Sequence, residues 1–550
     1  MISGLPAHWD RVVDVIVVGT GGAALTAATL AHDGGAEVLI LEKTGLLGGT
    51  TAVSGGVAWL PGNHHMAERG VADSREEAIA YLRRLAMGHE HDPALIEVFV
   101  DTAPEALAYL EARTPLRMAS IPNFPDYYFA YDVPGKKGAG RSVEPVPYAV
   151  GQELPAWRDR LVKRGTLMSL GAVTTLGEDF SAPDAALVAE LARREAEDVR
   201  TKGPALIAML FKGVLERGVE TLLSTPALEL VMADGAVVGV RADAGGRSLL
   251  IGARQGVVLA CGGYEWNKEL VRAFIGYDVQ PLSPPNNVGD GLVMAMEAGA
   301  QLANMNSYWG QPAMFDPEIT RDGEMVPQFE WGRGTPGSII VNRKGVRFAN
   351  ESQPYNDFPK NFGRYDPATV EFPNEAPAWM VFDQGVRDTT RILSMLPGGP
   401  TPSWVPQAPT MAGLAELIGV DAPALEATVA RFNEFAARGE DPDFGRTRVG
   451  LMGPGRVRPV DQPPYYAVVV HPGSLGTNGG PRLDAEARVR SNRGGVVAGL
   501  YAAGNTAASV FGWAYPGGGA TIGNGLVFAY RAGRHASSQP RRSIGGAGSS

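Results

Sequence analysis

The stretch from Asp14 to Gly56 restricts the possible folds of this chain more than any other. It reads DVIVVGTGGAALTAATLAHDGGAEVLILEKTGLLGGTTAVSGG. The run that follows Asp14 and ends at Val18 is apolar and β-branched, which predicts a strand buried in a parallel sheet. A second such run, Glu37 to Leu41, follows after a segment that suits a helix. Together these segments predict one βαβ unit.

The turn of this unit has the spacing G-x-G-x-x-A at Gly19, Gly21 and Ala24. The first glycine permits a tight turn, the second lets backbone approach a pyrophosphate, and the small third residue lets the helix pack closely on the sheet. The helix then directs its N-terminal N–H groups at the diphosphate. Glu42 lies eighteen residues after Ala24, where an acid accepts hydrogen bonds from ribose hydroxyls. The pattern predicts binding of an adenine dinucleotide.

The loop after Glu42 indicates a flavin rather than a nicotinamide. It reads LLGGTTAVSGG from Leu46 to Gly56 and places a second group of glycines and hydroxyls directly after the acid. A bare NAD-binding domain usually continues into another helix there, whereas flavoproteins of the glutathione reductase and fumarate reductase type use such a loop to wrap the diphosphate and flavin end of FAD. A Gly-rich loop without a ligand is the alternative. LLGGTT contains no histidine that could tether the flavin, so we expect FAD to be held non-covalently.

The strand, glycine and helix pattern returns twice, in GVVLACGGYEWN (Gly256 to Asn267) and in the C-terminal segments GLYAAGNTAA and WAYPGGGATIGNGLVFAYRAGRHA. A sheet that meets the diphosphate again is expected to return to a Gly pair in this way. The residues expected to bind FAD are Gly19, Gly21, Gly22, Ala23, Ala24, Glu42, Lys43, Gly48, Gly49, Thr50, Thr51, Ser54, Gly55, Gly56, Gly262, Gly263, Gly504, Asn505, Thr521 and Ile522.

These segments predict an α/β fold: a Rossmann-like FAD-binding domain of the glutathione reductase type with an inserted α+β substrate domain. We expect a discontinuous FAD-binding domain over residues 1–290 and 471–550, with a helical and loop excursion at about 73–202. The catalytic substrate domain is expected over 291–470. Within this frame the sequence predicts a hairpin over Glu229 to Ala242 and helices over Pro183 to Arg200 and Met411 to Arg438.

Composition excludes several classes of function. The net charge of −10 argues against nucleic acid as a partner. The single cysteine, Cys261, excludes internal disulfides, cysteine-ligated zinc and an iron–sulfur cluster carried by this chain. No HExxH pattern or G-x-S-x-G elbow occurs, and His64-His65 is most simply a solvated loop pair, so we expect no metal.

The sequence predicts a cytoplasmic protein. It has no signal-peptide pattern at its start and no run of 18 apolar residues. The uncharged stretch Thr166 to Gly177 is either a core segment or a surface-seeking patch beside an apolar pocket, which leaves peripheral contact with a membrane open.

Three further motifs make the chain resemble the 3-ketosteroid Δ1-dehydrogenases, within the fumarate reductase-like flavoproteins. They are PDYY (Pro125 to Tyr128), NRKGVRFANESQPY (Asn342 to Tyr355) and YPGGGATIG (Tyr515 to Gly523), and the resemblance covers nearly the whole chain. It implies that the Tyr515 hydroxyl and the Gly519 N–H hold the C3 ketone oxygen. Tyr355, supported by Tyr127, should take the proton from C2, and flavin N5 should accept hydride from C1.

Physical chemistry agrees with these roles. A C–H next to a ketone becomes acidic enough only if preorganised donors meet the charge that develops on the oxygen. A tyrosine is a weak base because its unperturbed pKa is about 10, so we expect Tyr127 to donate to Tyr355 and stabilise its phenolate. Tyr127 as simple loop packing is the alternative, with the neighbouring Tyr128 the residue most easily confused with it.

The resemblance also implies partners: an apolar 3-ketosteroid as substrate and an external, quinone-like electron acceptor. The segment between Arg141 and Gly203 is long for the family, which suits a side-chain-bearing sterol ketone or an apolar membrane surface. The oligomeric state and the steroid side chain stay open.

Three other readings remain. A ketosteroid desaturase acting at C4–C5 would use similar parts, and an electron-transfer or FAD-binding subunit would have no substrate of its own. A fumarate reductase-type enzyme needs clustered Arg and His to clamp two carboxylates, and the His471-Pro472 pair has no accompanying Arg pattern.

Overall fold

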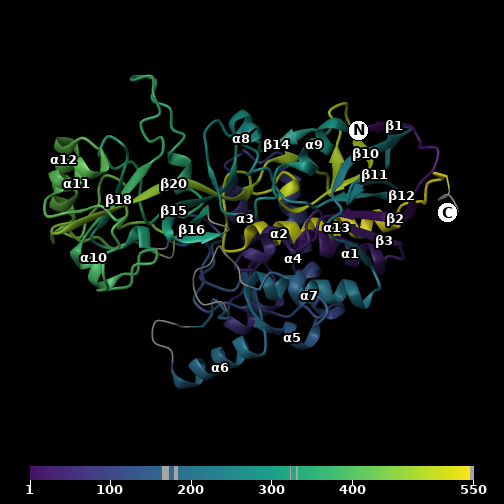
Figure 1. The fold of residues 1–550 in the computed structure, drawn as a ribbon, viewed down its shortest axis with the longest axis horizontal. Helices are drawn as coiled ribbons and strands as arrows, with labels where there is room; N and C mark the ends of the chain where they lie inside the picture. Colours follow the sequence, from purple (N-terminus) through teal and green to yellow (C-terminus); the bar gives the residue numbers. More distant parts are fainter. Residues whose placement is uncertain (164–172, 179–183, 322–323, 330–331, 452, 546–550) are drawn as a thin grey trace.

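The computed structural model describes residues 1–545, apart from 164–172, 179–183, 322–323, 330–331 and 452. Figure 1 shows an elongated molecule with two lobes. The first and last segments of the chain lie together at one end, where both termini are found, and green segments from the middle of the sequence form the other end. The two ends of the chain therefore build one lobe together, and the middle of the chain is inserted as the second.

The sheet of the first lobe runs in the order β1-β10-β11-β23-β12-β2-β3-β9, with β22 paired to β23. Its strands are β1 (Ile2–Ser3), β2 (Arg11–Val18), β3 (Val38–Leu41), β9 (Glu220–Leu222), β10 (Ala227–Ala233), β11 (Ala236–Ala244), β12 (Arg247–Leu259), β22 (Arg488–Arg490) and β23 (Val496–Ala502). The pairs β12–β2, β2–β3, β3–β9 and β12–β23 are parallel. The predicted hairpin is confirmed as β10 and β11, which turn at Asp234 and Gly235 with positive φ at both residues.

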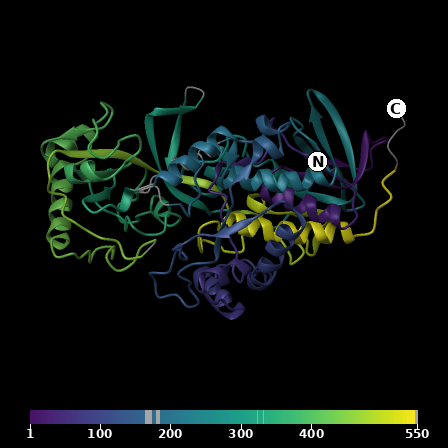
Figure 2. The same ribbon diagram turned by 90° about the horizontal axis from the view of Figure 1, so that it is seen from below.

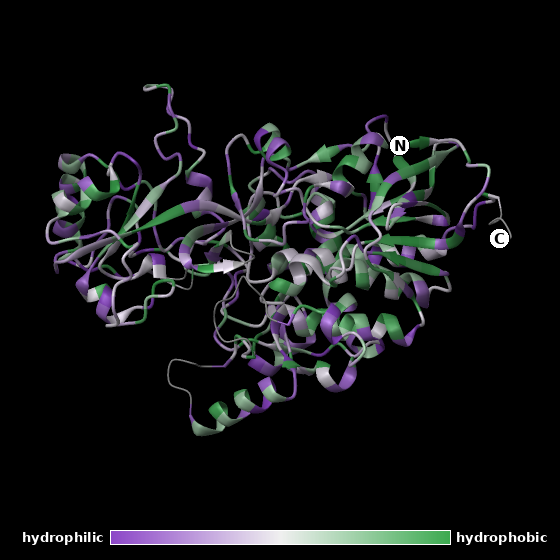
Figure 3. Cartoon of the chain, in the orientation of Figure 1, coloured by the Kyte–Doolittle hydropathy of each residue, from purple (hydrophilic) through white to green (hydrophobic). Residues whose placement is uncertain are grey.

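The helices that cover this sheet pack closely against one another because small residues lie where they meet. Helices α1 (Gly22–Asp33) and α13 (Ala520–Ser538) pack side by side, as Figure 2 shows for the purple and yellow helices. A Cβ at Gly533 would lie 2.4 Å from the backbone oxygen of Ala27, so only glycine permits this contact. α7 (Lys202–Glu216) packs against α1, and its apolar residues are buried. The strands around β2 are strongly apolar in Figure 3, in keeping with their burial on both faces.

The excursion after α2 (Gly49–Val53) is mostly helical. It contains η1 (His64–Arg69), α3 (Arg75–Ala86), α4 (Pro93–Arg113), α5 (Val150–Glu153), η2 (Arg158–Arg160) and α6 (Ala185–Ala196), with β4 (Ala58–Trp59), β5 (Met118–Ser120) and β6 (Ser142–Pro145) in a small sheet. Ser74 and Glu77 form a reciprocal capping box at the start of α3. The helix predicted over Pro183 to Arg200 is shorter than expected because its last residues form β8 (Val199–Arg200), which pairs with β7 (Tyr148–Ala149).

The second lobe has its own sheet, in the order β16-β15-β20-β18-β17. Its strands are β15 (Tyr308–Arg321), β16 (Glu324–Phe329), β17 (Ser338–Val341), β18 (Ala378–Asp383) and β20 (Tyr465–Thr477), with β13 (Gln280–Pro281) and β19 (Gln407–Ala408) paired to β20. The helix predicted over Met411 to Arg438 is two helices, α11 (Met411–Ile418) and α12 (Ala422–Ala436). Gly419 ends the first in the left-handed region, and Asp421 caps the second.

The remaining elements connect these parts. They are α8 (Lys268–Phe274), α9 (Asp290–Glu297), α10 (Gln384–Thr389), β14 (Leu302–Ala303), β21 (Gly480–Pro481), η3 (Gly332–Gly334), η4 (Phe358–Asn361) and η5 (Gly504–Thr506). The expected division at residues 290 and 471 stays a prediction. β13 lies before the first boundary and β20 crosses the second, yet both belong to the sheet of the second lobe.

Among the described residues, no helix has both the length and the apolar character needed to cross a bilayer. Most of the uncharged stretch from Thr166 onwards, residues 166–172, lies outside the described part of the chain.

Candidate active site

Two glycines in the turn between β2 and α1 are needed for different reasons. Gly19 has a φ of 108°, and a Cβ there would lie 2.5 Å from the backbone oxygen of Ala260 on the neighbouring strand. A Cβ at Gly21 would come no closer than 3.7 Å to any other part of the chain. Gly19 is therefore required by the fold, whereas Gly21 leaves its backbone open toward the space in front of the sheet.

That space is a cavity of about 500 Å³. The expected FAD-binding residues that line it are Gly19, Gly21, Gly22, Ala23, Glu42, Lys43, Gly49, Thr50, Thr51, Ser54, Gly262, Gly504, Asn505, Thr521 and Ile522. These residues come from the start, the middle and the end of the chain, and they meet at the carboxyl ends of β2, β3, β12 and β23. An open α/β sheet binds dinucleotides at this edge.

The other five expected residues, Ala24, Gly48, Gly55, Gly56 and Gly263, do not line the cavity. Ala24 is fully buried within α1. A Cβ at Gly48 would clash with Ile207, one at Gly56 with the Lys202 backbone, and one at Gly263 with Thr477, which explains why these three positions are glycine without a ligand. Their direct contact with a cofactor stays a prediction.

Sequence reasoning missed several residues that line the cavity: Pro284, Pro285, Asn286, Asn287, Asp290 and Gly525. Asn287 donates to Thr50 Oγ1 at 2.8 Å, and Lys43 Nζ lies 2.6 Å from Asp290 Oδ2. These pairs are separated by more than two hundred residues in the sequence, so no local pattern could have revealed them.

The side chain of Glu42, directly after β3, is fixed by hydrogen bonds. Its Oε2 accepts from Thr20 Oγ1 at 2.6 Å, and its Oε1 accepts from the backbone N–H and the hydroxyl of Thr44. The side chain is buried but lines the cavity, so its free lone pairs can accept from ligand hydroxyls. The open backbone at Gly21, the buried acid and the size of the cavity fit FAD.

Three tyrosines from distant parts of the sequence meet beside this cavity. The hydroxyl oxygens of Tyr127 and Tyr355 lie 3.0 Å apart. The ring of Tyr127 stacks on that of Tyr515 with centroids 5.8 Å apart, and the Tyr355 ring lies 5.1 Å from the first and 5.7 Å from the second. All three side chains are buried. The structure thus brings together the three expected catalytic tyrosines, although their catalytic roles stay proposals.

Backbone contacts fix these tyrosines to one another. The N–H of Tyr127 donates to the carbonyl of Pro516 at 3.0 Å, which ties its loop directly to the residue after Tyr515. Asn356, next to Tyr355, accepts from Gly310 N at 2.9 Å and donates to the carbonyl of Trp513 at 3.1 Å. These hydrogen bonds connect the Tyr127 and Tyr355 segments to the segment from Trp513 to Pro516, which carries Tyr515.

The loop that carries Tyr127 is anchored by a buried ion pair. Asp126 accepts from Arg141 at 2.8 Å and from the indole N–H of Trp59 at 2.8 Å. Burial raises the pKa of Asp126 to about 6, which the neighbouring Arg141 opposes. Arg141 is itself paired with Asp73 and packs over the rings of Trp59 and Tyr81.

Gly519 is the N-cap of α13, and its surroundings admit no side chain. Its φ is 89°, and a Cβ there would lie 2.2 Å from the backbone oxygen of Val57. Its carbonyl accepts from the N–H of Trp59 at 3.1 Å. Its own N–H forms a hydrogen bond with the phenol of Tyr515, so the two groups that are expected to bind the carbonyl lie next to each other.

Burial raises the pKa of all three phenols. The pKa of Tyr515 rises to about 12, although a hydrogen bond with Tyr355 and the N–H groups of Thr521 and Gly519 act in the opposite direction. The pKa values of Tyr127 and Tyr355 also lie above their usual range, with burial the largest cause. The expectation that Tyr127 donates to Tyr355 and stabilises its phenolate stays a prediction, because either hydroxyl of the pair can be the donor.

Two other sequence interpretations are resolved by geometry. Tyr128 points away from the three tyrosines and donates to Asp357 at 2.7 Å, so it is not a member of the cluster. The interpretation of His64-His65 as a solvated loop pair agrees with the exposure of His64 but is wrong for His65, which is 8% exposed, and both residues lie in η1 rather than in a loop.

Comparison with known families decides the class of this protein. The family model described as FAD binding domain matches residues 14–522, which is most of the chain. The chain belongs to this family. FAD is therefore the cofactor of this FAD-dependent oxidoreductase.

Curated relatives of this flavoprotein are similar over nearly their full length. The chain is 37% identical to 4-oxocyclohexanecarboxylate 2-dehydrogenase of Sinomonas cyclohexanicum, covering 95% of this chain and 92% of that protein. It is 35% identical to 3-oxosteroid 1-dehydrogenase of Mycobacterium tuberculosis, covering 96% and 98% of the two chains.

A solved structure gives the same result for the fold. The 3-ketosteroid Δ1-dehydrogenase of Sterolibacterium denitrificans, in complex with 1,4-androstadiene-3,17-dione, matches the flavoprotein with a TM-score of 0.86 at 32% identity. The match covers 96% of this chain and 100% of that one. The predicted fold, a Rossmann-like FAD-binding domain with an inserted α+β part, is confirmed.

The two glycines of the β2–α1 turn lead to opposite predictions. We expect Gly21→Val to fold but to bind little FAD, because its side chain fills the space open to the diphosphate without meeting the chain. We expect Gly19→Val to lower the thermal midpoint as well, because its Cβ meets the Ala260 carbonyl. Flavin content from the visible spectrum reports FAD binding, and thermal unfolding in the presence of excess FAD reports stability, so the two measurements separate the two effects. Full flavin occupancy in Gly21→Val would contradict the assignment of this turn.

Proposed function

We propose that this flavoprotein is a 3-ketosteroid Δ1-dehydrogenase, which removes hydrogen from C1 and C2 of a 3-ketosteroid and leaves a C1=C2 double bond. The observation that carries the proposal is the meeting of Tyr127, Tyr355 and Tyr515 beside the FAD cavity. Thr521 and Ile522 line that cavity and directly follow Gly519 and Ala520 at the start of α13. A ring bound against the tyrosines therefore lies next to the cofactor.

The Tyr515 hydroxyl and the Gly519 N–H are proposed to hold the ketone oxygen. Tyr515 stays protonated at every ordinary pH because burial raises its pKa to about 12, so it remains a donor. Gly519 must be glycine because a Cβ there would meet the Val57 backbone, and its N–H lies beside the Tyr515 phenol. Two preorganised donors in a buried site stabilise the enolate charge that develops when the neighbouring proton leaves.

Tyr355 is proposed to take the proton from C2. Its oxygen is hydrogen-bonded to that of Tyr127, so the pair provides both a base and a group to which the proton can be relayed. Bound FAD supplies the acceptor for the hydride that leaves C1. A quinone-like molecule is proposed to take the two electrons away in a second half-reaction.

A smaller ring ketone that carries a carboxylate is the second candidate substrate. The 4-oxocyclohexanecarboxylate 2-dehydrogenase at 37% identity favours it. Arg333 adds a local reason: its guanidinium donates to the carbonyl of Gln353, two residues before Tyr355, so it lies near the site. A guanidinium at that place would attract a substrate carboxylate, which an androstane ketone does not carry.

The fumarate reductase-type alternative is weakened by the surroundings of His471. This side chain packs edge to face on Phe315, and burial lowers its pKa, which favours the neutral ring over the charged form that would hold a carboxylate. The C4–C5 desaturase uses the same chemistry at a different ring position and is distinguished by its product.

Anaerobic mixing of the yellow protein with androst-4-ene-3,17-dione tests the proposal. We expect loss of flavin absorbance near 450 nm and formation of the 1,4-diene. The same experiment is repeated with three alternative substrates: a 5α-saturated 3-ketone, 4-oxocyclohexanecarboxylate and succinate. Reduction of the flavin by 4-oxocyclohexanecarboxylate alone would favour the second candidate substrate. A 4-ene product from the saturated ketone would favour the C4–C5 desaturase.

Removal of one hydroxyl tests the carbonyl site. We expect Tyr515→Phe to slow flavin reduction about 10²- to 10³-fold, because a donor to the developing oxyanion is lost. Tyr131→Phe is the matched control, since it removes a phenol hydroxyl from the neighbouring loop that lies outside the cluster. Equal rates in the two variants would contradict the role of Tyr515.

The raised pKa of Tyr355 predicts the pH dependence of the reductive step. Only the phenolate can accept a proton, and below the pKa its fraction rises tenfold with each pH unit. Because burial places that pKa above 10, the rate of flavin reduction should still be rising at pH 9. Stopped-flow rates between pH 6 and pH 9.5 check this. A plateau reached below pH 8 would show that bound substrate lowers the pKa of the base or that Tyr355 is not the base.

A further inference from the structure

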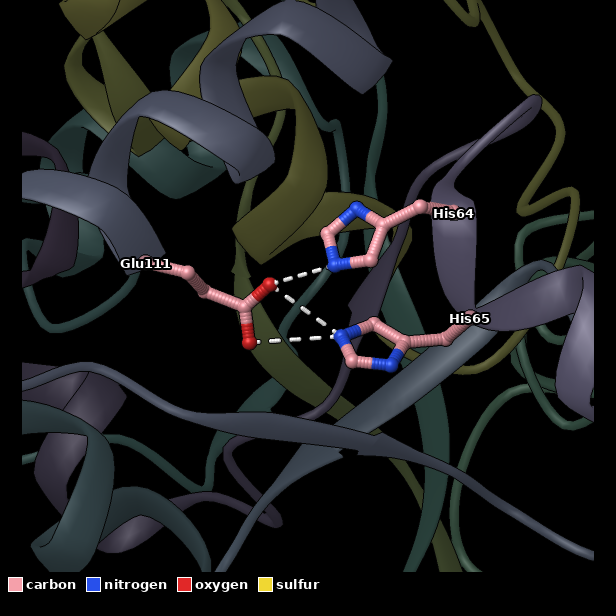
Figure 4. Close-up of side chains that lie close together, drawn as sticks. All are labelled: His64, His65 and Glu111. Carbon is pink, nitrogen blue, oxygen red and sulfur yellow. Dashed lines mark hydrogen bonds and ion pairs between the residues drawn. The ribbon is translucent and has the colours of Figure 1, made fainter.

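Two histidines and a glutamate meet at a place that the proposed chemistry does not use. Figure 4 shows the imidazole rings of His64 and His65 directed at the carboxylate of Glu111. The Nε2 atoms lie 2.8 Å and 3.1 Å from Glu111 Oε2. The histidines begin η1, and Glu111 lies in the last turn of α4, so the cluster joins two elements of the helical excursion.

Both ring nitrogens of His65 face carboxylate oxygens. Its Nδ1 lies 2.8 Å from Glu68 Oε1, and its Nε2 lies 3.1 and 3.2 Å from the two oxygens of Glu111. A neutral imidazole carries one N–H, so one of these nitrogens would face a carboxylate oxygen with a lone pair. A cation bound at one nitrogen would satisfy both contacts while the other nitrogen keeps the single ring proton.

We propose that His64, His65 and Glu111 bind a divalent transition metal, with zinc the best match. The two Nε2 atoms and one carboxylate oxygen supply three ligands, and water completes a tetrahedron. Glu68 then accepts from Nδ1–H of His65, which is the carboxylate–histidine arrangement that orients ligands in zinc sites. This choice satisfies both nitrogens of His65 with a single ring proton.

The positions of the ligand atoms are close to those that zinc requires. All of them lie within 4.8 Å of one another. Zinc–nitrogen bonds of about 2.05 Å in a tetrahedron separate the ligand atoms by about 3.3 Å. The two contacts with Glu111 Oε2, at 2.8 and 3.1 Å, therefore open by about 0.2 to 0.5 Å, and the two histidine nitrogens, within 4.8 Å of each other, approach by at most about 1.5 Å. His64 can move by this amount because its side chain is 49% exposed, and the same exposure gives the metal a way in.

The rest of the cluster is preorganised. Asn63 caps η1 by accepting from the N–H of His65 at 3.0 Å, and its amide donates to the carbonyls of Leu60 and Gly140. Glu111 Oε1 accepts from Met118 N at 2.8 Å, which ties the carboxylate to β5. A bound metal would connect η1, α4 and β5.

Metal binding by tag-free, FAD-loaded protein tests the proposal. After dialysis against EDTA and removal of the chelator, titration with ZnCl₂ should show one equivalent bound per chain by calorimetry and elemental analysis. Zinc should also raise the thermal midpoint, because it binds the folded chain. His64→Gln should weaken binding at least tenfold and remove the thermal shift. Glu68→Gln should weaken binding about 10- to 100-fold through loss of ligand orientation.

His8→Gln is the matched control, since His8 is an exposed histidine near an aspartate outside the cluster. It should keep the wild-type affinity for zinc. Circular dichroism of His64→Gln checks its fold. We expect the fold to be unchanged because His64 is exposed. No zinc bound by the wild-type protein would overturn the proposal. Equal binding by the wild type and His64→Gln would overturn it as well.

Discussion

The hydrogen bond between the hydroxyls of Tyr127 and Tyr355 is the contact on which the candidate site depends. The two residues are 228 positions apart in the sequence and come from different lobes. Their rings close on Tyr515, and the backbone bond from Tyr127 N to the Pro516 carbonyl holds the third member in place. A site assembled in this way exists only when both lobes are folded and docked.

Burial gives this cluster its chemistry. Each phenol is removed from water, which raises its pKa and keeps it a hydrogen-bond donor across the ordinary pH range. The same burial opposes the formation of the phenolate that proton abstraction requires. In the proposed mechanism, a ketone oxygen held by Tyr515 and Gly519 would draw charge away from the reacting carbon, which makes proton abstraction easier for a weakly basic tyrosine.

The local pattern of the sequence was enough for the FAD-binding sheet. The apolar run into Val18, the Gly19 turn and the run to Leu41 each specify their own structure, and the two runs pair in parallel as β2 and β3. Most of the expected cofactor residues line the cavity, because motifs that follow a strand end all meet at one edge of a parallel sheet. The helix expected over Met411 to Arg438 was interrupted, since a single glycine in the left-handed region outweighed the apolar periodicity around it.

What the sequence alone determined is the dinucleotide fold and, through resemblance, the choice of Tyr127, Tyr355, Tyr515 and Gly519 as the proposed site residues. These follow from short motifs whose residues are neighbours in the chain. What only the tertiary structure decided is which distant groups meet: the Lys43–Asp290 pair, the separation of Tyr128 from its neighbour Tyr127, and the burial of His65 against Glu111. The direction of the pKa shift in the tyrosine pair also needed the structure, because desolvation depends on everything packed around a group and not on its place in a motif.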